Sequence, residues 1–339
     1  MPDASQPSAR PGPRNLITDV AGIRVGNAVD ARAWTGVSVV LPDQRAVMAA
    51  DVRGGAPGTR EIHALDPSCL VDRADAVVLS GGSVFGLEAA SGVVARLAAD
   101  GRGFVLRSAV IPIVPAAILF DLVNGGDKSW GETPPYRRLG MDAVAAAAQD
   151  FLLGNVGAGY GAKAHRLKGG LGSASAVTSD GIEVGALVAV NSYGPVTIGD
   201  SKHFWAWALE QDGEFGGIGP PKSAIPLALE MPLPAASVAS PAVNTTIAVI
   251  ATNATLGKAE AERVAIMAQD GLARAIRPAH TPFDGDTVFA IATGRVPLVD
   301  ALMLARIGSL AADCLARAIC RGVYEAETLG RFPGYRSLA

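Results

Sequence analysis

The residues best suited to carry chemistry are a small polar pair, Asn244 and Thr245, which opens the apolar run TTIAVIAT after a stretch rich in Pro and Ala. If the peptide bond before Thr245 is broken, the threonine hydroxyl gains a free α-amine on its own residue. Such an amine has an unperturbed pKa of about 7.7–8.0, which suits a general base near neutral pH. The pair therefore predicts a nucleophile and its base within a single residue.

The chain could produce that amine without help. The Thr245 hydroxyl would attack the Asn244 carbonyl, an N-to-O acyl shift would give an ester, and water would release residues 1–244 and 245–339. Strain where the Pro/Ala-rich linker meets the strand would assist the attack. Thr246 is a rival nucleophile, and threonine is also common in strands without any chemistry. The pair alone leaves these interpretations open.

Further candidate site residues lie at the ends of other apolar runs. Asp284 and Asp286 flank Gly285 just before the run TVFAIA. Paired carboxylates could hydrogen-bond each other and orient a nucleophilic hydroxyl or its ammonium, although a turn before a strand would give the same pattern. Asn191 ends the run IEVGALVAVN and could be an oxyanion donor or an ordinary turn residue. Lys168 opens KGGLGSAS and could supply a cation to the site or lie in solvent.

Other chemistries fit the sequence less well. The histidines are His63, His165, His203 and His280. None lies in HExxH or beside a second histidine at ligand spacing, so we expect no metal. Ser83 in GGSVFG lacks the glycine that would complete a nucleophile elbow. The run GNVGAGYGA (154–162) lacks the Gly-Lys-Ser/Thr ending of a phosphate loop, and we interpret it as a loop that lets backbones pack closely. No cofactor is expected.

Composition narrows the class of protein. Hydrophobic residues make up 49% of the chain and charged residues 18%, which favours a globular fold with one large core. The net charge of -3 and the lack of long basic runs give no footprint for nucleic acid or an anionic membrane. Cys69, Cys314 and Cys320 form no CxxC pair, so neither a disulfide framework nor a zinc site is expected.

The N-terminus and the hydropathy bear on location. Residues 1–14 have no apolar h-region, and we expect a flexible tail there instead of a signal peptide. No run reaches the roughly 18 apolar residues that a membrane span needs. The sequence therefore favours a cytoplasmic protein whose single catalytic domain covers residues 15–339.

Hydrophobic periodicity predicts a mixed sheet sandwich covered by helices, an α+β fold. A strand hairpin is predicted over 36–52, around the turn PDQR. Single strands are predicted at 76–80, 182–191, 245–252 and 286–292. Helices are predicted from the glycines of LSGGS to about residue 99, and over 140–152, 261–276 and 303–318.

Seven motifs in order resemble one family. They are LSGGSVFGLEAA, VPAAILFDL, GNVGAGYGA, KGGLGSAS, VGALVAVNSYG, NTTIAVIATN and FDGDTVFA. Over roughly residues 15–325, the chain resembles the DmpA/NylC-type N-terminal-nucleophile peptidases. This family includes L-aminopeptidase D-Ala-esterases, β-peptidyl aminopeptidases and nylon-oligomer hydrolases. The resemblance implies a four-layer αββα sandwich of the DmpA/ornithine-acetyltransferase kind.

The resemblance also assigns roles. It implies that Thr245 is the nucleophile released by cleavage after Asn244, and that Asn191 stabilises the oxyanion. Asp284 and Asp286 match the two acidic positions of the nylon-hydrolase branch, whereas the β-aminopeptidase branch is similar to Ser-x-Glu there. For the catalytic lysine, matching through KGGLG favours Lys168, and matching through GAGYG places Arg166 at that position.

The function that these features imply is a self-processing amide hydrolase or aminopeptidase. It would release N-terminal amino acids from small peptides, amides or esters through an acyl-enzyme on Thr245. The alternatives are a nylon-oligomer-type endo-amidase, an acyltransferase of the ornithine acetyltransferase type, and an unprocessed binding protein that keeps the fold. Related enzymes assemble as oligomers, so we expect a homo-oligomer, such as a tetramer of processed protomers.

Overall fold

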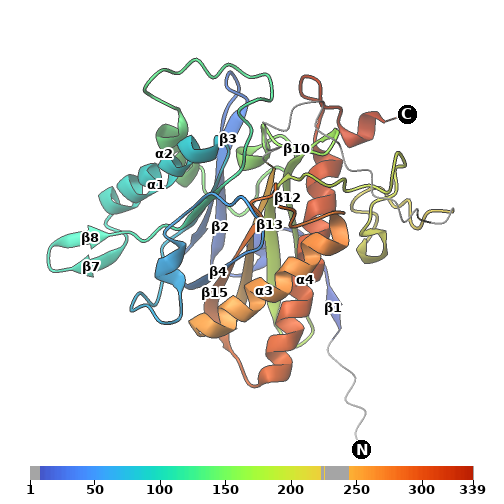
Figure 1. Ribbon diagram of the computed structural model, residues 1–339. Helices are drawn as coiled ribbons and strands as arrows, with labels where there is room; N and C mark the ends of the chain where they lie inside the picture. Colours follow the sequence, from blue (N-terminus) through green and yellow to red (C-terminus); the bar gives the residue numbers. More distant parts are fainter. Residues whose placement is uncertain (1–7, 223–224, 226–243, 339) are drawn as a thin grey trace, which may run out of the picture.

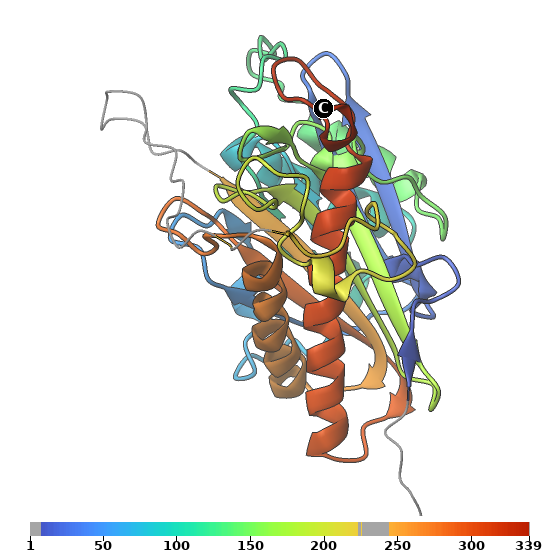
Figure 2. The ribbon, with the colours of Figure 1, turned by 90° about the vertical axis from the view of Figure 1, so that its right-hand side faces the viewer.

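Two β-sheets packed face to face form the centre of the molecule, and helices cover both outer faces (Figure 1, Figure 2). The structure is a computed structural model that describes residues 8–222, 225 and 244–338. The six-stranded sheet has the order β1 (Ala9–Arg10), β12 (Gly170–Thr178), β13 (Glu183–Asn191), β14 (Thr245–Thr255), β15 (Thr287–Pro297) and β4 (Val47–Val52). The five-stranded sheet has the order β2 (Ile23–Asp30), β3 (Thr35–Pro42), β6 (Val77–Ser80), β9 (Ala116–Ile118) and β5 (Thr59–Arg60).

The helices are split between the two faces. Helices α3 (Lys258–Ala275) and α4 (Ala301–Glu325) pack on the six-stranded sheet, while α1 (Glu88–Ala99) and α2 (Tyr136–Ala145) pack on the five-stranded sheet. Two small hairpins complete the fold: β7 (Phe104–Leu106) with β8 (Ala109–Ile111), and β10 (Lys163–Ala164) with β11 (Leu167–Lys168). The four layers confirm the predicted αββα sandwich.

Side-chain alternation along β14 shows how the layers are held together. Ile247, Val249 and Ala251 belong to the core between the two sheets, whereas Ala248 and Ile250 belong to the core beneath α3 and α4. Both faces of the strand are therefore buried, which explains its continuous apolar sequence. β14 runs antiparallel to β13 and parallel to β15, so it lies in the middle of the sheet.

Most predicted elements are present, with shifted ends. The strands expected at 76–80, 182–191, 245–252 and 286–292 are β6, β13, β14 and β15, and the four helices are α1 to α4. The helix expected over 140–152 instead spans Tyr136–Ala145. Its N-terminal turn, YRRLG, lacks the alanines that suggested a helix. Ala148, which lies within the predicted helical range, instead exchanges backbone hydrogen bonds with Val25 of β2.

The prediction that residues 36–52 form a hairpin is wrong. Both strands form, but β3 pairs with β2 and β6 in one sheet, while β4 pairs with β15 in the other. The turn PDQR is a crossing between the sheets, because both strands carry apolar residues that need separate partners.

The N-terminal segment also differs from the expected tail, since Ala9–Arg10 pair with Val177 and Thr178 of β12. The first seven residues and the Pro/Ala-rich stretch PLPAASVASPAV (232–243) lie outside the described residues.

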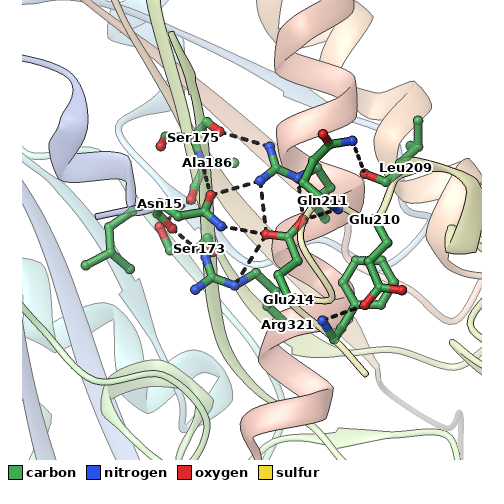
Figure 3. Close-up of polar contacts among 12 residues, drawn as sticks. Asn15, Ser173, Ser175, Ala186, Leu209, Glu210, Gln211, Glu214 and Arg321 are labelled. Atoms are coloured by element: carbon green, nitrogen blue, oxygen red, sulfur yellow. Dashed lines mark hydrogen bonds and ion pairs between the residues drawn. The ribbon is translucent and has the colours of Figure 1, made fainter. Parts of the chain in front are cut away.

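A buried ion cluster ties α4 to distant segments (Figure 3). Arg317 of α4 donates to both carboxylate oxygens of Glu214 at 2.6 and 3.0 Å and to the side-chain oxygen of Asn15 at 2.9 Å. Asn15 in turn donates to Glu214 at 2.6 Å, and Arg321 completes the cluster with a contact to Glu214 at 3.7 Å. The cluster thereby fastens the N-terminal segment and residues 201–217, which lie between β13 and β14 in the chain, to the C-terminal helix α4.

No helix in the described ranges is both long enough and apolar enough to cross a membrane.

Candidate active site

Asn191 and Thr245 lie directly opposite each other where β13 and β14 meet. By the alternation of these strands, both side chains face the core between the sheets, together with Ala189 and Ile247. Thr245 is 1% exposed and Asn191 is fully buried. Thr246 points the other way, toward the helix layer. The pleat therefore separates the two threonines and places Thr245 beside the predicted oxyanion donor.

Hydrogen bonds hold the backbone at the peptide between Asn244 and Thr245. The Asn244 N–H donates to the carbonyl oxygen of Phe283 at 3.0 Å, and the Gly285 N–H donates to the carbonyl oxygen of Asn244 at 3.0 Å. The Thr245 hydroxyl donates to this same Asn244 oxygen at 2.6 Å. The hydroxyl thus lies against the carbonyl that self-cleavage would attack.

The two acidic residues each accept three hydrogen bonds. Asp284 accepts from the Tyr193 N–H at 3.3 Å and from the N–H and hydroxyl of Thr281 at 2.9 and 2.6 Å. Asp286 accepts from the Thr246 N–H at 2.9 Å and from the N–H and ring of His280 at 3.1 and 2.8 Å. Burial, together with the negative charge of Asp286, raises the pKa of the Asp284 carboxyl.

The arrangement of these carboxylates corrects one expectation. Within the described ranges, Asp284 and Asp286 hydrogen-bond neither each other nor the Thr245 hydroxyl. Both are drawn instead toward N–H groups of the surrounding backbone, which are stronger partners for an anion than a second anion is. In the uncut chain they therefore shape the backbone around Thr245.

Lys168 and Arg166 occupy very different environments. Lys168 is fully buried, and its Nζ donates to the carbonyl oxygens of Gly159 and Gly169 at 2.9 and 2.6 Å. Burial lowers the pKa of Lys168 to about 7, and the Asp121 carboxylate opposes that shift. Arg166 is about half exposed and forms an ion pair with Asp200. Of the two candidates, only Lys168 lies inside the protein.

The glycine-rich run GNVGAGYGA contacts this lysine through Gly159 and packs closely against other backbone, as predicted. A methyl group at Gly159 would lie 2.0 Å from the Leu171 nitrogen, and Gly159 supplies one of the carbonyls that hold Lys168. Gly157 has a φ of +48°, in the left-handed region that favours glycine.

Asp121 is a buried polar residue beside the site that the sequence did not single out. The Asn191 side-chain nitrogen donates to the Phe120 carbonyl at 3.2 Å, which brings the end of β9 against β13. The adjacent Asp121 accepts from the Gly82 N–H at 2.8 Å and the Thr35 hydroxyl at 2.7 Å, and burial raises the pKa of its carboxyl. The only sequence signal was one acidic residue directly after the apolar run VPAAILF.

His280 and Lys163 also touch the predicted site residues. His280 holds Asp286, while the Lys163 N–H donates to the side-chain oxygen of Asn191 at 3.0 Å. His280 lies four residues before Asp284 in HTPFDGD, and this spacing is the sequence signal for its role. A backbone donor such as Lys163 leaves no trace in side-chain chemistry. Across the described ranges, no cluster of three or more His, Cys, Asp or Glu residues could hold a metal ion.

The loop RGGAPG packs on the turn that carries both carboxylates. The N–H groups of Arg53 and Gly54 donate to the Asp286 carbonyl, and the Ala56 N–H donates to the Asp284 carbonyl at 2.8 Å. A methyl group at Gly54 would lie 2.3 Å from the Asp284 oxygen and 2.4 Å from the Asp286 nitrogen. The glycine therefore permits this close backbone approach.

Solved structures identify the class of fold. The L-aminopeptidase D-Ala-esterase/amidase from Ochrobactrum anthropi, a new variant among the Ntn hydrolase fold, matches with a TM-score of 0.67 and 20% identity. The match covers 95% of this chain and 89% of that one. The architecture is therefore that of an N-terminal-nucleophile hydrolase fold, as the sequence predicted.

Sequence comparison then gives the family. The model of peptidase family S58 matches residues 15–336, and the chain belongs to this hydrolase family. An uncharacterized aminopeptidase of Mycobacterium tuberculosis is 45% identical, over 96% of this chain and 98% of the relative. A 6-aminohexanoate-oligomer endohydrolase of Kocuria sp. is 29% identical, over 85% of this chain and 77% of the relative. The family resemblance deduced from the seven motifs is confirmed.

Proposed function

We propose that the chain cuts itself between Asn244 and Thr245, and that Thr245 then hydrolyses amide bonds as an aminopeptidase. The observation that carries this proposal is the Thr245 hydroxyl, which lies 2.6 Å from the Asn244 carbonyl oxygen on a strand paired with Asn191. Membership of peptidase family S58 supports hydrolysis as the reaction.

In the processed enzyme, the free α-amine of Thr245 would take the hydroxyl proton as the hydroxyl attacks a substrate carbonyl. The Asn191 amide would stabilise the negative charge that develops on the oxygen of the substrate carbonyl. The amine would next protonate the leaving group, and water would release the acyl group from Thr245. Lys168, with a pKa near neutrality, is the buried cation that we propose supports this cycle.

Self-cleavage is tested by a pair of matched variants. Wild-type protein should give fragments 1–244 and 245–339 on denaturing electrophoresis, and sequencing of the smaller fragment should begin at Thr245. Thr245→Val should leave one intact chain. Thr246→Val is the control, because the buried Thr246 hydroxyl has no hydrogen-bond partner in the described ranges, and this variant should be cut normally. An intact wild-type chain with full activity, or a Thr245→Val chain cut at the same bond, would overturn the proposal.

The leading substrate class is a peptide, amide or ester with a free N-terminal amino acid. Support comes from the 45% identical relative, which is named as an aminopeptidase. A second candidate, an endo-amidase, is favoured by the DGD carboxylates and by the relative named as a 6-aminohexanoate-oligomer endohydrolase.

A blocked amine distinguishes these two activities. The processed enzyme should hydrolyse L-aminoacyl amides and lose activity when the substrate amine is acetylated. Equal turnover of free and acetylated 6-aminohexanoate oligomers would instead identify the endo-amidase. Transfer of the acyl group to a low concentration of added amine would identify an acyltransferase.

We also propose that the processed protomers assemble as a homo-oligomer in the cytoplasm. Native mass spectrometry of the purified enzyme measures the assembly, and fractionation of cells measures the location. A monomer at micromolar concentration would contradict the first part, and recovery outside the cytoplasm would contradict the second.

A further inference from the structure

The scissile peptide is held as an extension of the central sheet. Asn244 and Asp284 form a parallel bridge whose register continues that of the ladder between β14 and β15, where Ile247 pairs with Thr287. The bridge consists of the Asn244 N–H donating to Phe283 and the Gly285 N–H donating to Asn244, both at 3.0 Å. The carbonyl attacked during self-cleavage is thus already bound by a strand-like donor.

Next to this bridge, side-chain groups take the place of main-chain groups in the hydrogen bonds between the two segments. The Thr246 N–H donates to the Asp286 carboxylate at 2.9 Å, and the Thr287 hydroxyl donates to the Gly285 carbonyl at 3.0 Å. The bond to the Gly285 carbonyl holds the peptide unit after Gly285, and the Ala56 N–H, which donates to the Asp284 carbonyl at 2.8 Å, holds the peptide unit before it. The direction of its N–H is therefore set by the surrounding structure, as a preorganised donor requires.

Asn191 is engaged elsewhere while the chain is uncut. Its side-chain nitrogen donates to Phe120, and its side-chain oxygen accepts from Lys163. The backbone donor observed on the Asn244 oxygen is Gly285. The proposed function involves attack on two different carbonyls, that of Asn244 in self-cleavage and that of the substrate in turnover. The Asn244 carbonyl is bound by the Gly285 N–H before any substrate binds.

We infer that the Gly285 N–H is the oxyanion donor of self-cleavage, whereas Asn191 serves substrate turnover; this inference rests on the proposed self-cleavage. The Thr245 oxygen bonds to the Asn244 carbonyl carbon, and the carbonyl π electrons move to the Asn244 oxygen, facing Gly285. The C–N bond then breaks, and the hydroxyl proton ends on the Thr245 nitrogen. Water hydrolyses the resulting ester, giving the Asn244 carboxylate and the free hydroxyl and amine of Thr245.

Contacts around Gly285 explain why this donor is a glycine. A methyl group added there would meet the Thr245 hydroxyl oxygen at 2.7 Å and the Ala56 carbonyl oxygen at 2.7 Å. Any larger residue would push the nucleophile or the RGGAPG loop away. The missing side chain lets one backbone amide approach the scissile carbonyl while the nucleophile lies beside it.

Replacing one amide by an ester tests the donor without adding a side chain. Cell-free translation with glycolic acid on a suppressor tRNA substitutes an ester oxygen for the Gly285 N–H in the full chain. Self-cleavage should slow by about 10²–10³-fold, the usual effect of removing one oxyanion donor. The same ester at Gly131 is the control, because the Gly131 N–H has no acceptor in the part of the chain that the structure describes. Alkaline cleavage before residue 285 or 131 confirms each incorporation.

The outcomes separate this inference from the proposed function. If wild type and the Gly131 ester are cut, and the Gly285 ester is cut at the same rate, the donor role is overturned while self-cleavage stands. If the wild-type chain made in the same reaction remains whole, the proposed self-cleavage itself fails.

Hydrogen exchange gives a second test that does not depend on the ester variant folding. In the uncut Thr245→Val protein, the Gly285 amide should exchange at least 100-fold more slowly than an unprotected amide, as observed by NMR. Exchange of that amide at the unprotected rate would remove the hydrogen bond on which the inference depends.

Discussion

Asn191 and Thr245 are opposed residues of two antiparallel strands, and both side chains face the core between the sheets. A rigid, fully buried ladder therefore fixes their separation. In the proposed reaction, this arrangement brings an amide and a hydroxyl that lie more than fifty residues apart in sequence to one substrate carbonyl. It also links the central sheet to the proposed chemistry, because a shift in register by one residue would turn the Thr245 side chain to the other face of the sheet.

Replacing Asn191 by alanine should impair turnover more than it impairs self-cleavage. We expect kcat/KM to fall by about 10²–10³-fold, because a preorganised donor is lost from the transition state. Self-cleavage, which we assign to the Gly285 donor, should slow by less than about tenfold. Asn253→Ala is the matched control, since the Asn253 side chain also bridges two backbone groups but lies at the other end of β14. Equal losses of both reactions in Asn191→Ala would contradict this division.

The RGGAPG loop should control the turn beside the scissile bond. In Gly54→Ala, the new methyl group would strike two backbone atoms of the turn at 2.3 and 2.4 Å, and backbone cannot yield as a flexible side chain can. We expect self-cleavage to slow by at least about tenfold, measured as the decay of the full-length band. Gly257→Ala is the control, because a methyl group there has only a contact at 3.6 Å with Glu260. Normal cleavage of Gly54→Ala would show that the loop does not position the turn.

Much of the fold follows from residue patterns, because buried strands and amphipathic helices leave strong periodic signals. The β14 run and the face of α3 formed by Ala261, Ala265, Ala268 and Leu272 are examples, and all of these α3 residues are fully buried. The prediction of a hairpin over 36–52 is wrong for a specific reason. A short turn between two apolar runs looks the same whether the strands pair or separate into two sheets, and only long-range pairing with β2, β6 and β15 decides between these arrangements.

The site shows the same division between local and long-range information. Thr245, Asn191, Asp284 and Asp286 were identifiable because each lies at a strand end in a recognisable motif. Asp121 and the Gly285 amide were not, because their importance arises from contacts with segments distant in sequence. The choice between Thr245 and Thr246 was open in sequence, whereas the pleat of β14 puts only Thr245 beside Asn191.

Lys168 should leave a mark on the pH dependence of stability. Its folded pKa of about 7 lies below the ordinary value of 10.5, so the unfolded chain binds more protons between these two pH values. Stability of the wild type should therefore gain up to about 1.4 kcal/mol per pH unit from this group across that window. Lys168→Met removes this contribution. The difference in urea unfolding free energy, variant minus wild type, should accordingly fall as the pH rises from 7 to 10, whereas a constant difference would show that burial does not lower the pKa of Lys168.

The Glu214 cluster should hold the two halves of the processed enzyme together, because Glu214 precedes the cleavage site and Arg317 follows it. Their side chains are only 7% and 5% exposed. Glu214→Gln keeps the shape but leaves Arg317 and Arg321 without their shared carboxylate, and losing one partner of a buried pair costs about 3–5 kcal/mol. Chemical unfolding should be measured in the Thr245→Val background, where the chain stays in one piece. The control is Asp100→Asn in the exposed Arg96–Asp100 pair, which should change stability by less than about 1 kcal/mol. If both substitutions lower the free energy of unfolding by the same small amount, the cluster does not fasten α4 to residues 201–217.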